Sequence, residues 1–277
     1  MDHSEPVQQA ESEPIPVRRG DPVPLAARAT PLSAKRATLS RENTIHLRPT
    51  TTLAERVLLP GDPGRALALA QFLLESPLMF NHNRGLWGYT GTAIDGEPLT
   101  IQSTGMGGPS AAIVLHELIS LGVTRAIRVG TCGALDPGLG LGDLVVAREA
   151  IAADGTSAAL GVDRLARADS TLADVLAREA AGRRERAHRE GRIVSTDLFY
   201  ERDSTRNANW SANGALAVEM EAATLFAVGA NAGIQVACIL AVSDTFDGPD
   251  ARVRIDDDAL TLAAEAMGSA AVAALSA

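Results

Sequence analysis

The chain has 277 residues, of which 46% are hydrophobic and only 3% aromatic, so its core has to be built mainly from aliphatic side chains. Its net charge of −9 argues against a polyanion such as DNA as the main partner, but local arginines can still hold a small phosphate. The two cysteines, Cys132 and Cys238, are too few for a disulfide framework and suit small core positions.

The first 43 residues differ in composition from the rest of the chain. They are rich in Pro, Ala, Ser, Glu and Arg and show no sustained apolar period, so we expect a disordered extension before a single domain over residues 44–277. No apolar run reaches the ~18 residues of a membrane-spanning helix, and the N-terminus lacks the apolar segment of a secretory signal. We therefore expect a cytoplasmic protein that binds neither membranes nor nucleic acid.

Short β-like runs alternate with helical patterns from about Thr44 onward. The patterns predict strands within residues 56–60, 98–107, 125–130, 142–151, 215–220 and 234–244, and helices within residues 61–74, 109–122, 221–233 and 256–276. Pro63 suits the first turn of the first helix, and Gly122 suits the end of the second. This alternation is typical of an α/β domain whose mostly parallel sheet is covered by helices.

Residues that could bind a ligand or take part in catalysis lie at the carboxyl ends of the predicted strands. In open α/β sheets ligands bind at these ends. One binding site at this edge of the sheet is therefore expected, and it would gather Gly61, Gly105, Arg128, Met220 and Asp244.

Arg128 stands inside an apolar, strand-like run, directly before a glycine-containing loop. A guanidinium keeps its charge, so its burial is costly unless either a protein carboxylate or an anionic ligand meets it. Thr131 adds a hydroxyl beside it. The stretch PGDPGR, residues 60–65, is a second anion-binding candidate, because a helix N-terminus offers free N–H groups and Arg65 adds donors. A plain βα turn with a surface arginine is the alternative there.

Two acidic stretches complete the candidate site. Glu219 and Glu221 flank Met220, and strand alternation puts both carboxylates on one side if the strand continues that far. Glu221 can accept hydrogen bonds from a sugar diol, or it can serve as a helix N-terminal acid. Ser243 and Asp244 end an apolar strand, where a carboxylate can act as a general acid or as a cap. The sequence shows no Cys/His spacing of a metal site, so no metal is expected.

Five motifs in order resemble the nucleoside phosphorylases of the purine nucleoside phosphorylase and uridine phosphorylase type. They are VLLPGDPGR, NRGLWGYTGT, STGMGGPSAAI, RVGTCGAL and VEMEAAT, and the resemblance covers roughly residues 44–275. It implies a three-layer αβα domain around a twisted mixed, mostly parallel sheet. It also implies reversible phosphorolysis, in which a nucleoside and orthophosphate give a free base and ribose 1-phosphate without a cofactor. Members of this family are usually hexamers, so we expect a homo-oligomer with shared active sites.

The resemblance implies roles for particular residues. Gly61, Arg65, Arg128 and Thr131 are expected to hold the attacking phosphate, and Arg84 matches an arginine that the family lends to the neighbouring subunit's phosphate site.

Met220 and Glu221 are expected to bind the ribose. His46 matches a histidine that caps the ribose in the neighbouring subunit's site. Phe199 aligns with the aromatic residue that stacks near the base.

The residues at the base favour a purine. Ser243 and Asp244 match the pair in purine-specific members whose aspartate donates a proton to N7, and Arg252 or Arg254 is a candidate for the arginine that polarises it. The uridine branch reads its pyrimidine with a glutamine and an arginine, and the stretch 199–210 contains no glutamine. A uridine phosphorylase-like enzyme, a nucleosidase that uses water and a non-enzymatic nucleoside-binding module are the alternatives.

Overall fold

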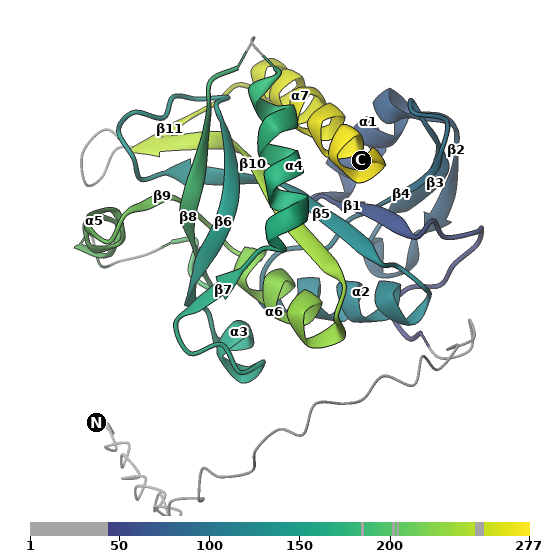
Figure 1. The fold of residues 1–277 in the computed structure, drawn as a ribbon, viewed down its shortest axis with the longest axis horizontal. Helices are drawn as coiled ribbons and strands as arrows, with labels where there is room; N and C mark the ends of the chain where they lie inside the picture. The colour runs from purple at the N-terminus through teal and green to yellow at the C-terminus, as the bar shows by residue number, and fades with distance from the viewer. Residues whose placement is uncertain (1–43, 184–185, 201–202, 204, 247–251) are drawn as a thin grey trace, which may run out of the picture. The chain divides into compact units, whose positions relative to one another are not determined.

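The computed structural model describes residues 44–183, 186–200, 203, 205–246 and 252–277. All of the helices and strands in these ranges belong to one compact unit, Thr38–Ala277 (Figure 1). The expected disordered extension, residues 1–43, lies outside the described residues.

One mixed sheet forms the centre of this unit. Its strands are β1 (Arg56–Leu59), β2 (Leu74–Asn81), β3 (Gly88–Ala93), β4 (Pro98–Gln102), β5 (Arg125–Ala134), β6 (Leu144–Ala153), β7 (Leu165–Arg167), β8 (His188–Thr196), β9 (Ala215–Glu219), β10 (Gln235–Phe246) and β11 (Arg252–Arg254). Their order is β11-β10-β6-β8-β9-β5-β1-β4-β3-β2, with β7 paired to β6 and an additional pairing of β10 with β5.

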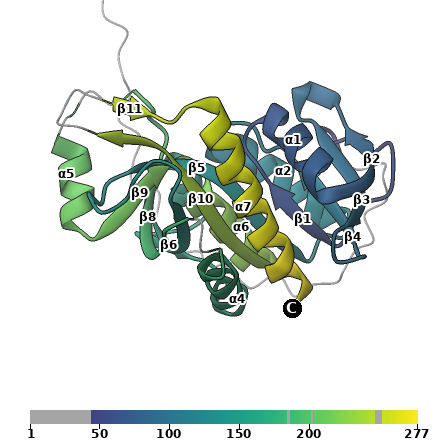
Figure 2. The same ribbon diagram turned by 90° about the horizontal axis from the view of Figure 1, so that it is seen from above.

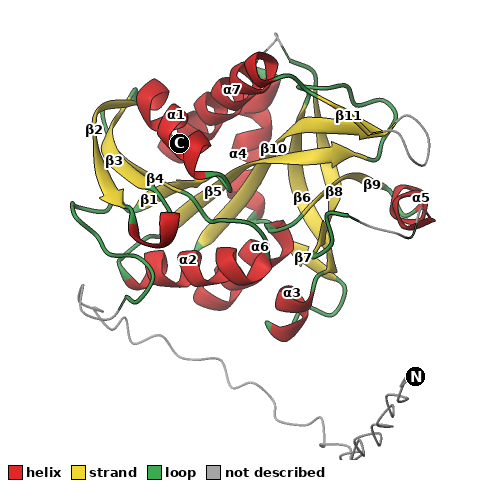
Figure 3. Cartoon of the chain, turned by 180° about the vertical axis from the view of Figure 1, so that it is seen from behind, coloured by secondary structure: helices red, strands yellow, loops and turns green. Residues whose placement is uncertain are grey.

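Helices cover the sheet on both faces. Helices α1 (Pro63–Leu73), α4 (Ser170–Ala181) and α7 (Asp257–Ser276) lie on one side, and α2 (Gly108–Ser120), α3 (Gly155–Ala159) and α6 (Ala222–Ala232) lie on the other (Figures 1 and 3). Helix α5 (Thr205–Ala212) stands apart from both layers, beside β9 (Figures 1 and 2).

The two helical layers bury two hydrophobic clusters, one on each face of the sheet. In β1, Leu58 packs in the cluster with α1 and α7, whereas Val57 and Leu59 pack in the cluster with α2 and α6. This is the two-residue alternation of a strand that is buried on both faces. Both cysteines are buried, as expected for small core residues.

The expectation of a three-layer α/β fold with a mixed sheet is confirmed. Among the described residues five strand pairings are parallel, and they join β1, β4, β5 and β10 and also β6, β8 and β9. Six pairings among these residues are antiparallel, so the sheet is mixed but not mostly parallel as expected. Four of the six come from the hairpin-like run β2-β3-β4 and from the short strands β7 and β11. The sequence patterns predicted no element between residues 152 and 214, where α3, β7, α4, β8 and α5 lie.

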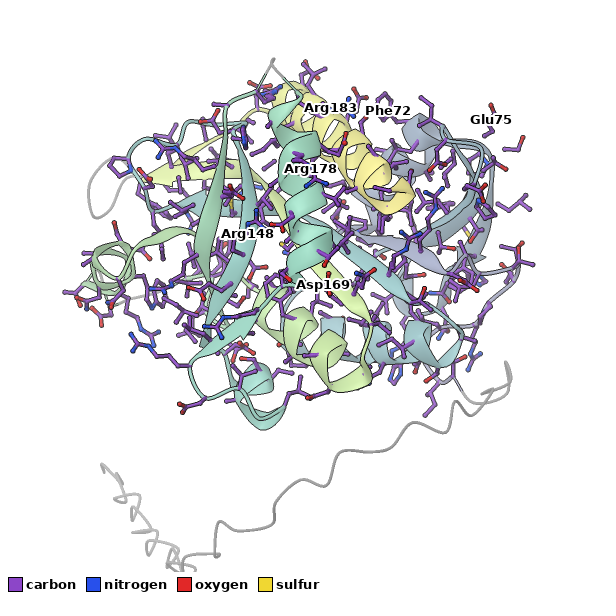
Figure 4. All side chains as sticks on the ribbon, viewed as in Figure 1. Phe72, Glu75, Arg148, Asp169, Arg178 and Arg183 are labelled. Atoms are coloured by element: carbon purple, nitrogen blue, oxygen red, sulfur yellow. The ribbon has the colours of Figure 1, made fainter. Side chains whose placement is uncertain are left out.

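Helix α4 illustrates how charge stabilises a helix of this outer layer. Asp169 caps its N-terminus by accepting a hydrogen bond from Leu172 N at 2.8 Å, while Arg178 lies in its last turn and Arg183 follows it. Figure 4 labels Asp169, Arg178 and Arg183 along this helix. An acidic residue at the positive N-terminal end of the dipole and basic residues at its negative C-terminal end both stabilise the helix.

Helix α7 is the one described helix that is long and apolar enough to cross a membrane by length and composition. Half of its most apolar window is buried, and it packs against α1, α4 and β10. Core helices of globular domains have these properties as well.

Candidate active site

A cavity of about 670 Å³ opens where β1, β5, β9 and β10 end, at the edge of the sheet where a site was expected. Nine of the eleven predicted site residues line it, and these are Gly61, Arg65, Arg128, Thr131, Phe199, Met220, Glu221, Ser243 and Asp244. The remaining two, His46 and Arg84, lie outside this cavity.

One end of the cavity is formed by the turn between β1 and α1. Pro63 occupies the first turn of α1, and Asp62 caps the helix by accepting a hydrogen bond from Arg65 N at 2.7 Å. The Arg65 side chain lines the cavity, where burial lowers the pKa of its guanidinium and Asp62 opposes that effect. Gly61 lies against Gly105 in the loop after β4, since an added Cβ would come within 3.4 Å of Gly105 O.

Arg128 is buried and meets two carboxylates. Its Nε donates to Glu219 Oε2 at 2.9 Å, and its Nη2 forms an ion pair with Glu221. The negative charges of Glu221 and Glu219 raise the pKa of the guanidinium, although burial alone would lower it. Its Nη1 is buried and finds no hydrogen-bond partner among the described residues. Nη1 faces Gly61, where an added Cβ would lie 4.0 Å away. Protein carboxylates therefore hold Arg128 while leaving one donor for an anion in the cavity.

Glu219 organises this corner of the site. It accepts hydrogen bonds from the Ser195 hydroxyl, from Glu221 N at 2.9 Å and from Ala222 N at 3.0 Å, besides the one from Arg128. A buried carboxylate with this many donors fixes their positions.

The strand does not continue as far as Glu221, so strand alternation is not what brings the two carboxylates to one side. Strand β9 ends at Glu219, and Glu221 is the residue that precedes helix α6. The two carboxylates still converge on Arg128, because the chain turns at Met220 and Glu221 Oε1 accepts a hydrogen bond from Gly107 N at 2.6 Å.

Asp244 is buried in the last part of β10 and also lines the cavity. The Ser243 hydroxyl donates to its Oδ2 at 2.6 Å, and Arg254 Nη1 lies 3.3 Å from its Oδ1. Asp244 and Arg254 are direct partners in the register of β10 and β11. Of the two arginines left open by the sequence, Arg254 is thus the one that contacts Asp244.

Arg252 lies instead between aromatic rings at the mouth of the cavity. Its guanidinium carbon is 4.2 Å from the centre of the Phe199 ring and 5.5 Å from that of Phe246. These distances are in the range of cation–π contacts. Tyr200 meets the Phe199 ring edge to face, with ring centres 5.1 Å apart.

Phe246 was missed in the sequence. It lies two residues after Asp244 in β10, so it faces the same way, and its ring packs on the backbone of Gly133. The alternation of the strand is the signal that could have found it.

His46 and Arg84 lie on two neighbouring segments. Asn83 Nδ2 donates to His46 O at 2.8 Å, which ties the short helix η2 (Asn83–Gly85) to the first described residues. Arg84 is exposed and has a positive φ of 58°, a conformation uncommon for any residue other than glycine. Asn81, buried at the end of β2, supports both segments by accepting hydrogen bonds from Arg48 N at 2.9 Å and Asn83 N at 3.3 Å.

Known proteins are similar to this chain over most of its described length. A family model described as the phosphorylase superfamily matches residues 55–276. The "Purine nucleoside phosphorylase DeoD-type" of Geobacillus kaustophilus is 40% identical over 198 residues, which is 70% of this chain and 83% of that protein. The proteins of the same name from Clostridium novyi and Caldanaerobacter subterraneus are each 40% identical, over 196 and 199 residues, covering 70% of this chain and 83% and 84% of their own lengths.

Proposed function

The chain belongs to the phosphorylase superfamily, and we propose that it is a purine nucleoside phosphorylase, a pentosyltransferase that converts a purine nucleoside and orthophosphate into the free base and ribose 1-phosphate. Its relatives carry that name at 40% identity. One observation carries the proposal: a single cavity is lined both by Arg128, with its free donor, and by the Asp244–Arg254 pair.

The part of the cavity beside Arg128 suits the phosphate. The unpartnered Nη1 of Arg128 faces Gly61, and the Arg65 side chain and Thr131 line the same part of the cavity. Two guanidinium groups and a helix N-terminus can hold a phosphate dianion in a fixed place. Because Glu219 and Glu221 anchor Arg128 beforehand, little reorganisation is needed when the anion enters.

The part of the cavity beside Met220 and Glu221 suits the ribose. Met220 offers an apolar surface, and the Glu221 carboxylate can accept hydrogen bonds from sugar hydroxyls. During the reaction the bond from C1′ to the base nitrogen breaks and a bond from C1′ to a phosphate oxygen forms. The sugar gains oxocarbenium character meanwhile, and the anchored dianion stabilises that positive charge.

The part of the cavity beside Asp244 suits the base. The leaving purine takes up the electron pair of the broken bond, and a proton delivered to N7 neutralises it. Asp244 is the group that we assign to that delivery, with Ser243 and Arg254 holding its carboxyl group from two sides. Phe199 and Phe246 provide aromatic surface for the purine ring at the mouth.

We also propose that the active unit is at least a dimer, and a hexamer by analogy with the family, with His46 and Arg84 reaching into the neighbouring subunit's site. Their position outside their own chain's cavity supports this assignment. Apolar side chains near them, Ile45 and Trp87, are 71% and 38% exposed, which suits a surface covered by a second copy. This scheme uses no cofactor, since orthophosphate is a co-substrate, and we expect the enzyme in the cytoplasm.

Phosphorolysis of uridine is not favoured, because the similar proteins are named for purine nucleosides and Asp244 has its arginine partner.

Base release from inosine, guanosine, adenosine and uridine, with and without orthophosphate, tests the proposal. Phosphate-dependent release of purine bases is expected. Release of uracil alone would move the enzyme to the pyrimidine branch. Release that needs no phosphate would identify a nucleosidase.

A further inference from the structure

Glu117, on helix α2, collects the hydrogen bonds of a segment some seventy positions before it. Its Oε1 accepts from Ile45 N and His46 N, both at 3.1 Å, and its Oε2 accepts from Leu47 N at 2.7 Å. Its carboxylate also lies 2.7 Å from Nδ1 of the His46 ring. Three successive backbone N–H groups that converge on one anion form a nest, which fixes the local backbone.

The Glu117 carboxylate is well suited to hold a neutral imidazole in one tautomer. Only 14% of its side chain is exposed. Burial alone would raise the pKa of Glu117, but the hydrogen bonds from Leu47 and His46 outweigh it and lower the pKa. Glu117 is therefore an acceptor, so the proton of the neutral ring belongs on Nδ1 and Nε2 is left as an acceptor. A quarter of the His46 side chain is exposed.

The segment on both sides of His46 is held as firmly as its ring. Leu47 is fully buried in the core cluster with α2, and Asn83 Nδ2 donates to His46 O at 2.8 Å. The backbone of His46 and the Nδ1 atom of its ring are thus held in place, and Nε2 is the ring nitrogen left for another partner.

We propose that Glu117 is a positioning residue, which holds the His46 imidazole with Nε2 presented to accept a hydrogen bond from a ribose hydroxyl in the neighbouring subunit's site. The inference rests on the proposed function. Glu117 touches no substrate in this scheme. It acts through His46, so its removal should change the KM for the nucleoside and not the KM for phosphate.

The test compares Glu117→Gln, His46→Ala and the double variant in steady-state phosphorolysis of inosine. One hydrogen bond to the sugar corresponds to a roughly two- to tenfold rise in the KM for inosine in each single variant. Because such a contact contributes equally to ground and transition states, kcat and the KM for phosphate should stay unchanged. In the His46→Ala background, Glu117→Gln should add nothing.

A second readout does not depend on turnover. The ¹⁵N resonances of the His46 ring should report the Nδ1–H tautomer in the full-length protein and a mixture of tautomers in Glu117→Gln. His116→Gln, a change to an exposed histidine on the same helix, should alter neither the tautomer nor the KM. Glu117→Asp, which retracts the same carboxylate by one methylene group, serves as the second variant if the glutamine variant folds poorly, and the same rise in KM is expected.

Additive effects in the double variant, or an unchanged His46 tautomer in Glu117→Gln, would overturn the inference. If the wild-type protein releases no purine while the tautomer still depends on Glu117, the proposed function fails and the coupling of the two residues stands.

Discussion

Arg128 Nε lies 2.9 Å from Glu219 Oε2, deep in the sheet. This ion pair compensates the buried charge of Arg128 and fixes the guanidinium whose Nη1 is left for a ligand in the cavity. A lone guanidinium here would be destabilising, and a guanidinium saturated by carboxylates would have nothing left for a ligand. With Nε and Nη2 paired and Nη1 free, Arg128 lies between these extremes.

Arg128→Lys should therefore damage phosphate use while the charge is retained. An ammonium group is a single point charge and cannot serve Glu219, Glu221 and a phosphate together. We expect kcat/KM for phosphate to fall about 10²- to 10³-fold. Initial rates over a range of phosphate concentrations measure this. Arg148→Lys is the matched control, since Arg148 pairs with Asp174 and Glu190 beside α4 (Figure 4) and should leave the rate unchanged.

Gly130→Ala should displace the same guanidinium by contact. An added Cβ would come within 2.7 Å of Arg128 Nη2 and 2.8 Å of its Cζ, so the side chain has to move. We expect the KM for phosphate to rise about tenfold, the equivalent of one lost charge-assisted hydrogen bond. Gly140→Ala is the control: it adds a Cβ at an ordinary 3.6 Å from Asp143 and should leave the KM for phosphate unchanged. Equal KM values in the two variants would contradict this account of Gly130.

Much of this site could be predicted because its residues lie in the last parts of apolar strands. The expectation of a loop directly after Arg128 was wrong, however, since β5 continues to Ala134. Arg128, Thr131, Ser243 and Asp244 each stand where β5 or β10 reaches the cavity. Asp62 and Pro63 begin α1 where the local pattern indicated.

The remaining features depend on pairings that one sequence does not reveal. The choice of Arg254 over Arg252 follows from the register of β11 on β10, and the convergence of Glu219 and Glu221 follows from a turn instead of a continued strand. Strands β2 and β3 were missed because β2 is largely exposed and carries Pro77, which weakens an alternating pattern.

Asp244→Asn should separate substrates by their leaving groups. Cleavage of inosine, whose base needs a proton, should fall by about 10²-fold or more, whereas nucleosides with a leaving group that needs no proton should be cleaved at nearly the wild-type rate. Arg254→Met should show the same selectivity to a smaller degree because it contacts Asp244. Arg252→Met, which removes a cation from the Phe199 ring, should change the KM for the nucleoside without this selectivity. Equal losses on both substrate types would remove Asp244 from the acid role.

The proposed sharing of sites predicts complementation between two inactive variants. Arg84→Ala and Arg128→Ala should each be nearly inactive, the first through the neighbour's site and the second through its own. Dissociation and reassembly of an equal mixture should restore about a quarter of the wild-type sites, because only mixed pairs contain one intact site. Activity that stays at the level of the separate variants would show that Arg84 serves no neighbouring site.

Acid stability should depend on Asp95, which lies in the turn between β3 and β4 and does not line the cavity. Arg56, with 6% of its side chain exposed, donates to Asp95 from Nη1 at 2.5 Å and from Nη2 at 2.7 Å, and Ser276 at the end of α7 bonds the same carboxyl group. The hydrogen bonds from Arg56 hold the pKa of Asp95 well below its ordinary value. A depressed carboxyl pKa contributes stability above the unfolded pKa of about 3.9, and this contribution is lost as the pH falls through the folded value.

Asp95→Asn should therefore lower the free energy of unfolding by about 2 kcal/mol at pH 7, less than for a fully buried pair because Asp95 is partly exposed. The difference from the wild type should shrink below pH 4, because Asp95 of the unfolded chain then takes up a proton while the same carboxylate of the folded protein stays charged until a lower pH. Urea unfolding at pH 7, 5 and 3 measures the trend. Asp174→Asn, at the 60% exposed partner of Arg148, should cost less than about 1 kcal/mol at every pH. A pH-independent difference between Asp95→Asn and the wild type would mean that packing around Ser276, and not the charge of Asp95, stabilises this end of the sheet.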